Sequence, residues 1–324
     1  MYTELHALNV LGVPYKHAFA SEIWEPAIRY IRANHRPCVM HHDMTQRALK
    51  AAPKCDLYLC SSPCQPVSVM NAKKKIDDKR REPLSHALDY IRAKQPKYWV
   101  FENVLGLMRV DKGSVWRSLC SQLDAMCMEL GYRWSYQVLD PCKHADSPQS
   151  RPRVYICGRK GDTQINWPSE VPLTKRCVEL LDARARSTGR TRADSGTLAA
   201  CYKRQLAIWG ITPGEDEGIV EFCASSRAHS PYKNKEPLTS KQRAHVLKAD
   251  IAPCMIKHDP GLYAVHLDRM LTADECLLLQ GHTDPSKVTK PQVTDLQMRQ
   301  LCGNAMHMGV LACVLECLLD ESDM

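Results

Sequence analysis

The sequence predicts an α/β fold: a doubly wound, mostly parallel sheet with a small inserted region. Short apolar strands alternate with helices up to about residue 157, and regular structure returns near the C-terminus. Strands separated by helices of this length are typical of βαβ units and a parallel sheet. Recurrent glycine and proline between about residues 160 and 262 indicate a separate region. We therefore expect 1–160 with 263–324 to form one domain and 161–262 a second.

The individual elements follow from hydrophobic periodicity and from turn residues. A helical pattern over Glu4–Leu11 ends at Gly12 and Pro14. The alternation that follows predicts strands at 17–23, 55–61, 98–101, 134–139 and 154–158, and helices at 25–34, 84–94 and 116–130. Near the C-terminus we expect a helix over 272–280 and a long helix from about 303 to 319.

The composition is that of a globular protein with a basic excess. The 324 residues are 44% hydrophobic and 25% charged, and the formal net charge is +8. This excess is a weak indication of a polyanionic partner such as nucleic acid, and a merely basic soluble enzyme is the alternative.

The cysteine pattern and the first residues of the sequence indicate in which cellular compartment the protein is expected. Sixteen cysteines are scattered along the chain, and no charged leader with an apolar run opens it. We therefore expect reduced thiols and an intracellular protein. The absence of C-x-x-C spacing argues against a structural zinc, so no metal is expected. No window approaches the length and apolarity of a membrane span, so no membrane partner is expected.

Four acidic or nucleophilic side chains follow predicted strands or end them. These are Glu22, Asp43, Cys64 and Glu102. The carboxyl ends of parallel strands share one edge of a sheet, so we expect these residues to lie on that edge. A thiol in the proline-framed turn Ser62–Pro66, together with a carboxylate, would suit attack on an electron-poor ring. Taken alone, either motif is better explained by a buried cysteine and a solvated glutamate.

The combination of motifs resembles the cytosine-C5 DNA methyltransferase family. Cys64 stands in PCQ, Glu102 in ENV, and Gln149–Arg153 forms Q-x-R-x-R, in the family's order. Residues 77–80 resemble the family's mobile catalytic loop, and 271–281 and 303–305 its closing motifs. The resemblance covers residues 3–160 and 268–319, and it implies the Rossmann-like fold of class I methyltransferases.

The resemblance implies roles for four catalytic residues. The Cys64 thiolate would add to C6 of cytosine, and Glu102 would hydrogen-bond N3 and the exocyclic amine. Arg153, with Arg151 beside it, would hold the base and Glu102 in place. The target base of duplex DNA would have to be flipped out of the stack.

The resemblance also implies S-adenosylmethionine as cofactor. Glu22 would bind the ribose hydroxyls, and Asp43 the adenine amine. The other expected cofactor contacts are Ile23, Met44, Pro63, Asn304 and Ala305. Without the flanking motifs, a helix cap or a surface charge would be the favoured interpretation of each carboxylate.

Nucleic-acid contacts are expected next to the nucleophile. The residues concerned are Gln65, Ser68, Lys79 and Arg80. The basic stretch 73–81 suggests phosphate contacts from the catalytic loop; a nuclear localisation signal and a plain solvated loop are alternatives. If the source is eukaryotic, the nucleus is the expected location.

The sequence departs from the family at its beginning. The family opens with a strand and a glycine-rich turn of the F-x-G-x-G-G type, whereas Met1–Glu4 already enters the helix after that turn. Losing a central strand would leave unpaired backbone groups and an apolar gap. We expect the sequence to be an incomplete version of a longer protein, with a damaged cofactor pocket as the alternative.

Two other functions stay open beside DNA methylation. The same chemistry on transfer RNA is one, because a branch of the family methylates it. A non-catalytic DNA-binding relative or a truncated fragment is the other, because the glycine motif is missing. An unrelated cysteine hydrolase is disfavoured, since it would need a histidine base and no such motif adjoins Cys64.

Overall fold

A computed structural model describes residues 3–61, 82–185, 196–221, 236–256, 262–290 and 292–323. The chain divides into two compact units. The large-sheet unit comprises Tyr2–Asp140, Pro152–Glu170 and Met308–Met324. The small-sheet unit comprises Met1, Pro141–Arg151 and Val171–His307.

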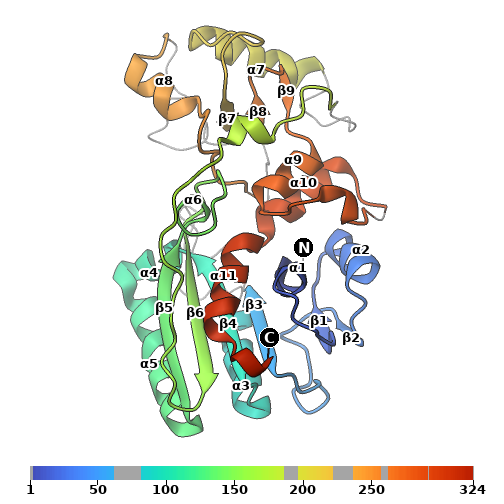
Figure 1. Cartoon of the computed structure of the whole chain (residues 1–324), viewed down its shortest axis with the longest axis vertical. Coiled ribbons are helices and arrows are strands. Elements are labelled where there is room, and N and C mark those ends of the chain that lie inside the picture. Colours follow the sequence, from blue (N-terminus) through green and yellow to red (C-terminus); the bar gives the residue numbers. More distant parts are fainter. Residues whose placement is uncertain are drawn as a thin grey trace. The chain divides into compact units, whose positions relative to one another are not determined.

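A four-stranded sheet in the order β3-β4-β6-β5 organises the large-sheet unit (Figure 1). Strand β6 is antiparallel to both of its neighbours, whereas β3 and β4 are parallel. Strands β3, β4 and β5 therefore share one direction and only β6 is reversed, which confirms the predicted α/β class. The bounds are β3 Leu57–Ser61, β4 Tyr98–Val104, β5 Tyr132–Leu139 and β6 Arg153–Lys160.

Helices between these strands cover the sheet and complete its core. Helix α5 ends where Gly131 adopts a left-handed conformation (φ 67°) and its N–H bonds the Cys127 carbonyl. Glycine is favoured there because it has no Cβ to clash. The core combines strand residues such as Trp99 and Ile156 with helix residues such as Leu88 and Leu123. The helices are α3 Glu82–Lys94, α4 Gly106–Arg109, the 3-10 turn Val110–Gly113 and α5 Ser114–Leu130.

A second, two-stranded sheet lies in the same unit. Strands β1 (Phe19–Ser21) and β2 (Val39–His41) are parallel, and helix α2 (Glu25–Asn34) connects them. Within the described ranges, neither strand pairs with the four-stranded sheet.

Side chains join the two sheets of this unit. Arg47 is buried, and its guanidinium carbon lies 5.0 Å from the ring centroid of Phe19 on β1 and 4.9 Å from that of Tyr90 on α3. It also donates to Ser21 Oγ at 3.2 Å. The Phe19 and Tyr58 rings stack with centroids 6.3 Å apart. In the described residues no backbone ladder links the two sheets, and cation–π and ring contacts connect them instead.

The first and last helices of the unit pack against each other. These are α1 (Thr3–Val10) and α11 (Met308–Leu318). After α11, the chain turns at Asp320, whose carboxylate accepts a hydrogen bond from Tyr98 Oη at 2.6 Å and pairs with Arg159. The chain then ends in the 3-10 turn Glu321–Asp323.

The small-sheet unit contains an antiparallel sheet in the order β7-β8-β9 (Figure 1). Its core includes Leu206, Trp209 and Met270. The strands are β7 Ile219–Glu221, β8 Leu262–Ala264 and β9 Arg269–Met270. The helices are α6 Pro141–His144, α7 Gly196–Ile208, α8 Ser240–Val246, α9 Ala273–Leu279 and α10 Asp295–Asn304, with 3-10 turns at Cys177–Leu180 and Pro285–Lys287.

Three sequence expectations need correction. Strand β2 was not expected, because its three residues are too few and too exposed to form an apolar run. Strand β4 continues to Val104 instead of ending at Phe101, so Glu102 lies within it. The expected long helix 303–319 is interrupted, since α10 ends at Asn304 and α11 begins at Met308.

The same C-terminal region bears on membrane insertion. Within the described residues, Asp295–Leu318 alone has the length and apolarity that a membrane span requires, contrary to the expectation that no window would. Its most apolar stretch is 72% buried inside the protein, as in a core helix.

Gly158 faces Trp99 across the β4–β6 ladder, and a Cβ there would lie 2.1 Å from the indole ring. We expect Gly158→Ala to destabilise the protein by about 1–3 kcal/mol, the usual cost of overpacking a dense core. Urea unfolding measures this loss. The same change in a Trp99→Leu background should cost much less, and an equal cost in both backgrounds would contradict the assigned clash.

Candidate functional site

Part of the predicted site lies outside the described residues. This applies to the expected nucleophile Cys64 and to Pro63, Gln65, Ser68, Lys79 and Arg80. Strand β3 is described up to Ser61, three positions before Cys64. The segment that carries the thiol therefore begins at the carboxyl end of β3, as the sequence predicts.

Glu102 lies beside that strand end as a buried carboxylate. Strand register places it directly opposite Ser61, and Ser61 Oγ donates to Glu102 Oε2 at 3.0 Å. Arg153 Nε lies 3.3 Å from the other carboxylate oxygen, Oε1. The Glu102 side chain is only 6% exposed and that of Arg153 14%. A buried carboxylate needs such partners, because an unpaired charge is costly in the interior.

The register of β4 with β6 explains why Arg153 reaches Glu102. Arg153 is the first residue of β6 and stands opposite Val104, two residues beyond Glu102. Side chains two residues apart on a strand share a face, so Arg153 and Glu102 meet diagonally. The predicted association of these two residues is therefore present in the structure.

Arg151 makes a different set of contacts within the small-sheet unit. Its guanidinium donates to the carbonyls of Met255 at 3.0 Å, Gly303 at 3.1 Å and Ala305 at 2.6 Å. The side chain is buried. These bonds hold the chain around Asn304 against residue 255, which is a positioning role. A direct role for Arg151 with the base stays a prediction.

The two expected cofactor carboxylates follow the paired strands β1 and β2. Glu22 comes directly after Ser21, and its Oε1 accepts the N–H groups of Ile23 and Trp24, both at 2.9 Å. Asp43 Oδ1 accepts the backbone N–H and the hydroxyl of Thr45, both at 2.8 Å. Because parallel strands end at the same edge, the two carboxylates lie at one edge of this small sheet.

The remaining expected cofactor residues differ in exposure. Ile23 is 73% exposed, as a residue available to a ligand would be. Met44 is half-buried and packs against the core of the large-sheet unit. In the small-sheet unit, Asn304 ends α10 and is exposed, whereas Ala305 is buried and its carbonyl accepts from Arg151. Their cofactor roles stay predictions.

The sequence reasoning missed one buried carboxylate, Glu4. It lies in the first turn of α1 on the same side as Ala7 and Leu8, and is 9% exposed. Burial raises the pKa of the Glu4 carboxyl to about 7. The available signal was its spacing of three and four residues from these apolar positions, which places it on the buried face.

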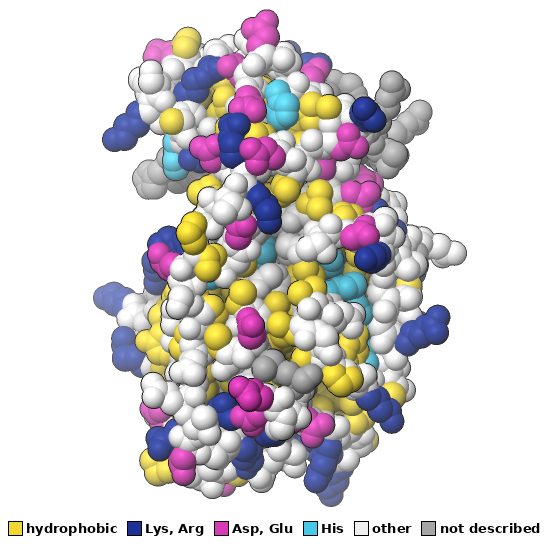
Figure 2. Space-filling view, in the orientation of Figure 1, with side chains coloured by type: hydrophobic (Ala, Val, Ile, Leu, Met, Phe, Trp, Pro, Cys, Tyr) yellow, Lys and Arg dark blue, Asp and Glu magenta, His cyan; other side chains and the backbone are white. Residues whose placement is uncertain are grey.

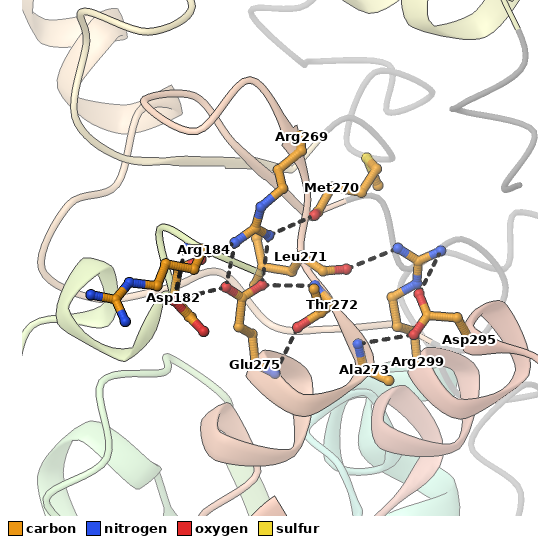
Figure 3. Close-up of polar contacts among 10 residues, drawn as sticks. All are labelled: Asp182, Arg184, Arg269, Met270, Leu271, Thr272, Ala273, Glu275, Asp295 and Arg299. Carbon is orange, nitrogen blue, oxygen red and sulfur yellow. Dashed lines mark hydrogen bonds and ion pairs between the residues drawn. The ribbon is translucent and has the colours of Figure 1, made fainter. Parts of the chain in front are cut away.

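A polar network surrounds Glu275 in the small-sheet unit (Figure 3). Both oxygens of its carboxylate bind the guanidinium of Arg269, at 2.7 and 2.8 Å. The same carboxylate accepts the backbone N–H groups of Thr272 at 2.7 Å and Asp182 at 3.0 Å. Glu275 therefore ties the start of α9 to strand β9 and to the chain at residue 182.

Charge on the surface is distributed without one dominant patch on the face shown in Figure 2. Lys and Arg side chains lie mainly around its edges, interspersed with Asp and Glu.

In the part of the chain that the structure describes, no group of three or more His, Cys, Asp or Glu residues is arranged to hold a metal ion.

Comparison with known proteins decides the family. The family model described as C-5 cytosine-specific DNA methylase matches residues 5–319. The chain belongs to this family. The resemblance inferred from the PCQ, ENV and Q-x-R-x-R motifs is thereby confirmed, and so is the fold class.

Individual members of the family match to different extents. The orphan methyltransferase M.Rho11sI of Bacillus phage rho11s is 35% identical over 158 residues, which is 48% of this chain and 30% of that protein. The chain spans only 30–36% of M.Rho11sI, M.SPRI of Bacillus phage SPR and M.BsuFI of Bacillus subtilis. The type II methyltransferase M.Bsp6I of Bacillus sp. (strain RFL6) is 23% identical over 308 residues, 93% of this chain and 90% of that protein.

Solved structures share the fold. Dnmt2 methyltransferase of S. pombe superposes with a TM-score of 0.64 and 20% identity, covering 99% of this chain and 96% of that one. The Entamoeba histolytica methyltransferase EhMeth gives a TM-score of 0.60 and 19% identity, covering 94% of this chain and 90% of that one. At such identities the likeness concerns the fold alone.

Glu275 offers a test of the network in Figure 3. We expect Glu275→Gln to lower the free energy of unfolding by about 3–5 kcal/mol, because it leaves the largely buried Arg269 guanidinium without its counter-charge. Denaturant unfolding checks this. The exposed neighbour Asp274, changed to Asn, is the matched control and should cost under about 1 kcal/mol. Equal losses would show that the network carries no particular stability.

Proposed function

We propose that the protein methylates C5 of cytosine in DNA, with S-adenosylmethionine as methyl donor and Cys64 as nucleophile. The observation that carries this proposal is the family match over residues 5–319, together with a Glu102–Arg153 pair beside the strand that leads to Cys64. Transfer RNA is less well supported as substrate, because the matching family is named for DNA.

The chain's own residues suit the chemistry of cytosine. The Cys64 thiolate would form a bond to C6, and the electron pair of the C5–C6 double bond would become available at C5. Glu102, once protonated, would donate a hydrogen bond to N3 and accept one from the exocyclic amine, stabilising the charge in the ring. Arg153 would keep Glu102 in place. Loss of the C5 proton and cleavage of the sulfur–C6 bond would restore the enzyme.

The residues present fit the proposed cofactor. Glu22 has the position at the end of β1 where carboxylates bind ribose in dinucleotide-binding folds, and Asp43 lies at the same edge. Ile23, Met44, Pro63, Asn304 and Ala305 complete the proposed set. When bound, S-adenosylmethionine supplies the methyl group.

The proposed substrate also sets expectations for recognition and location. A cytosine in a duplex would have to be flipped out, at a cost of a few kcal/mol. We assign its recognition to 161–262, and contacts next to the nucleophile to Gln65, Ser68, Lys79 and Arg80. A DNA substrate implies an intracellular location. In a eukaryote this location would be the nucleus.

Covalent trapping tests the nucleophile. Fluorine at C5 blocks the final proton loss, so we expect the protein and S-adenosylmethionine to form a stable adduct with a pool of random-sequence duplexes containing 5-fluorocytosine. Mass spectrometry detects the adduct and its attachment site. Cys64→Ala should abolish it, and Cys38→Ala, which removes an exposed thiol, should not. An adduct that survives Cys64→Ala would refute this assignment.

A further inference from the structure

We propose that Glu4 is a cofactor-binding residue whose carboxylate holds the positively charged methionine part of S-adenosylmethionine. The inference rests on the proposed function. It assigns a role to a side chain that the family motifs in this sequence do not mark.

The first observation is that Glu4 is buried with an oxygen unused. The residue is 9% exposed, and its Oε2 has no hydrogen-bond partner among the described residues. A buried polar atom without a partner costs free energy, and a carboxylate costs more than a neutral group. Such an atom in a folded protein calls for a ligand or another functional reason.

The second observation is where this carboxylate lies. The negative charges of Glu102 and Glu22 both act on Glu4, and the charge of Glu4 acts in turn on Cys60. These residues lie at or near the carboxyl ends of different strands: Cys60 in β3, Glu102 two residues before the end of β4, and Glu22 directly after β1. Glu4 is therefore close to the residues at or near the carboxyl ends of β1, β3 and β4 in the large-sheet unit.

The electrostatics of this position favour a cation. Burial is the main reason for the raised pKa of Glu4, and the two neighbouring carboxylates raise it further. A hydrogen bond to its own backbone and the positive chain terminus act in the opposite direction. Glu102 and Glu22 are acidic like Glu4, so they repel its negative charge. A bound cation would supply the positive charge that stabilises the ionised Glu4 carboxylate. A metal ion suits the site poorly, because the described residues hold no cluster arranged to bind one.

The order of the ligand's parts identifies the cation. In the proposed complex, Glu22 binds the ribose and Glu102 the cytosine. The sulfur of S-adenosylmethionine is attached to the ribose and its methyl group must approach the cytosine, so the sulfonium would lie between the two, and the methionine chain would branch from it. The Glu4 carboxylate interacts electrostatically with both Glu22 and Glu102. Its charge therefore complements the sulfonium and the ammonium group.

Calorimetric titration of the full chain tests this with two ligands. S-adenosylmethionine carries the sulfonium, the ammonium group and a carboxylate, with a net positive charge, and 5′-methylthioadenosine carries the same adenosine part with none of these. We expect Glu4→Gln to weaken binding of S-adenosylmethionine at least tenfold and to change binding of 5′-methylthioadenosine less than twofold. Glu129→Gln, an exposed glutamate of α5, is the matched control and should change neither.

Proton release gives a second readout, independent of turnover. A cation bound at Glu4 lowers its pKa, so binding at pH 7 should release up to about half a proton per ligand. Titration in two buffers with different ionisation enthalpies measures the release. It should disappear in Glu4→Gln and for 5′-methylthioadenosine.

The outcomes separate this inference from the cofactor proposal. Unchanged binding of S-adenosylmethionine by Glu4→Gln would overturn the role of Glu4 and leave the cofactor in place. Equal weakening of both ligands would also overturn it, because that result indicates a structural role. If the unaltered protein binds neither ligand, the cofactor proposal fails and this inference fails with it. Thermal unfolding shows whether Glu4→Gln is folded.

Discussion

The burial of Glu102 is the constraint around which the proposed active site is organised. A carboxylate in the interior is tolerated only with partners, and here Ser61 and Arg153 each occupy one of its oxygens. Both partners come from neighbouring strands, so the pairing depends on the register of β3, β4 and β6. A shift of one residue in any of these strands would turn a partner to the other face of the sheet.

Outside this sheet, arginine side chains connect neighbouring elements and loop segments. Arg47 spans the two sheets of the large-sheet unit, and Arg151 gathers three backbone carbonyls around the end of α10. Arg269 connects β9 to the start of α9. The planar guanidinium suits these places because it offers five donors in a fixed geometry. None of these roles requires contact with a substrate.

Local sequence patterns predicted the strands and helices better than they predicted which side chains contact one another. The apolar run of β4, the helical spacing of α5 and the position of Glu102 near a strand end were all readable, because each depends on neighbouring residues. The helical spacing of Glu4 indicated a buried face but not its neighbours, and the contacts of Arg47 depend on residues far apart in sequence, so periodicity gave little indication of these contacts. The interruption between α10 and α11 was missed because Gly303–His307 contains no proline and remains apolar enough to read as helix.

The two-stranded sheet has a consequence for how the protein moves. Within the described residues, β1 and β2 form a ladder with each other and are held to the four-stranded sheet by side-chain packing, so the energy needed to open them is lower than that of a strand with ladders on both sides. Amides of Phe19–Ser21 should therefore exchange with solvent faster than those of β4. A ligand that bridges Glu22 and Glu102 would close this weak joint and slow that exchange, so occupancy of the site and rigidity of the sheet would rise together.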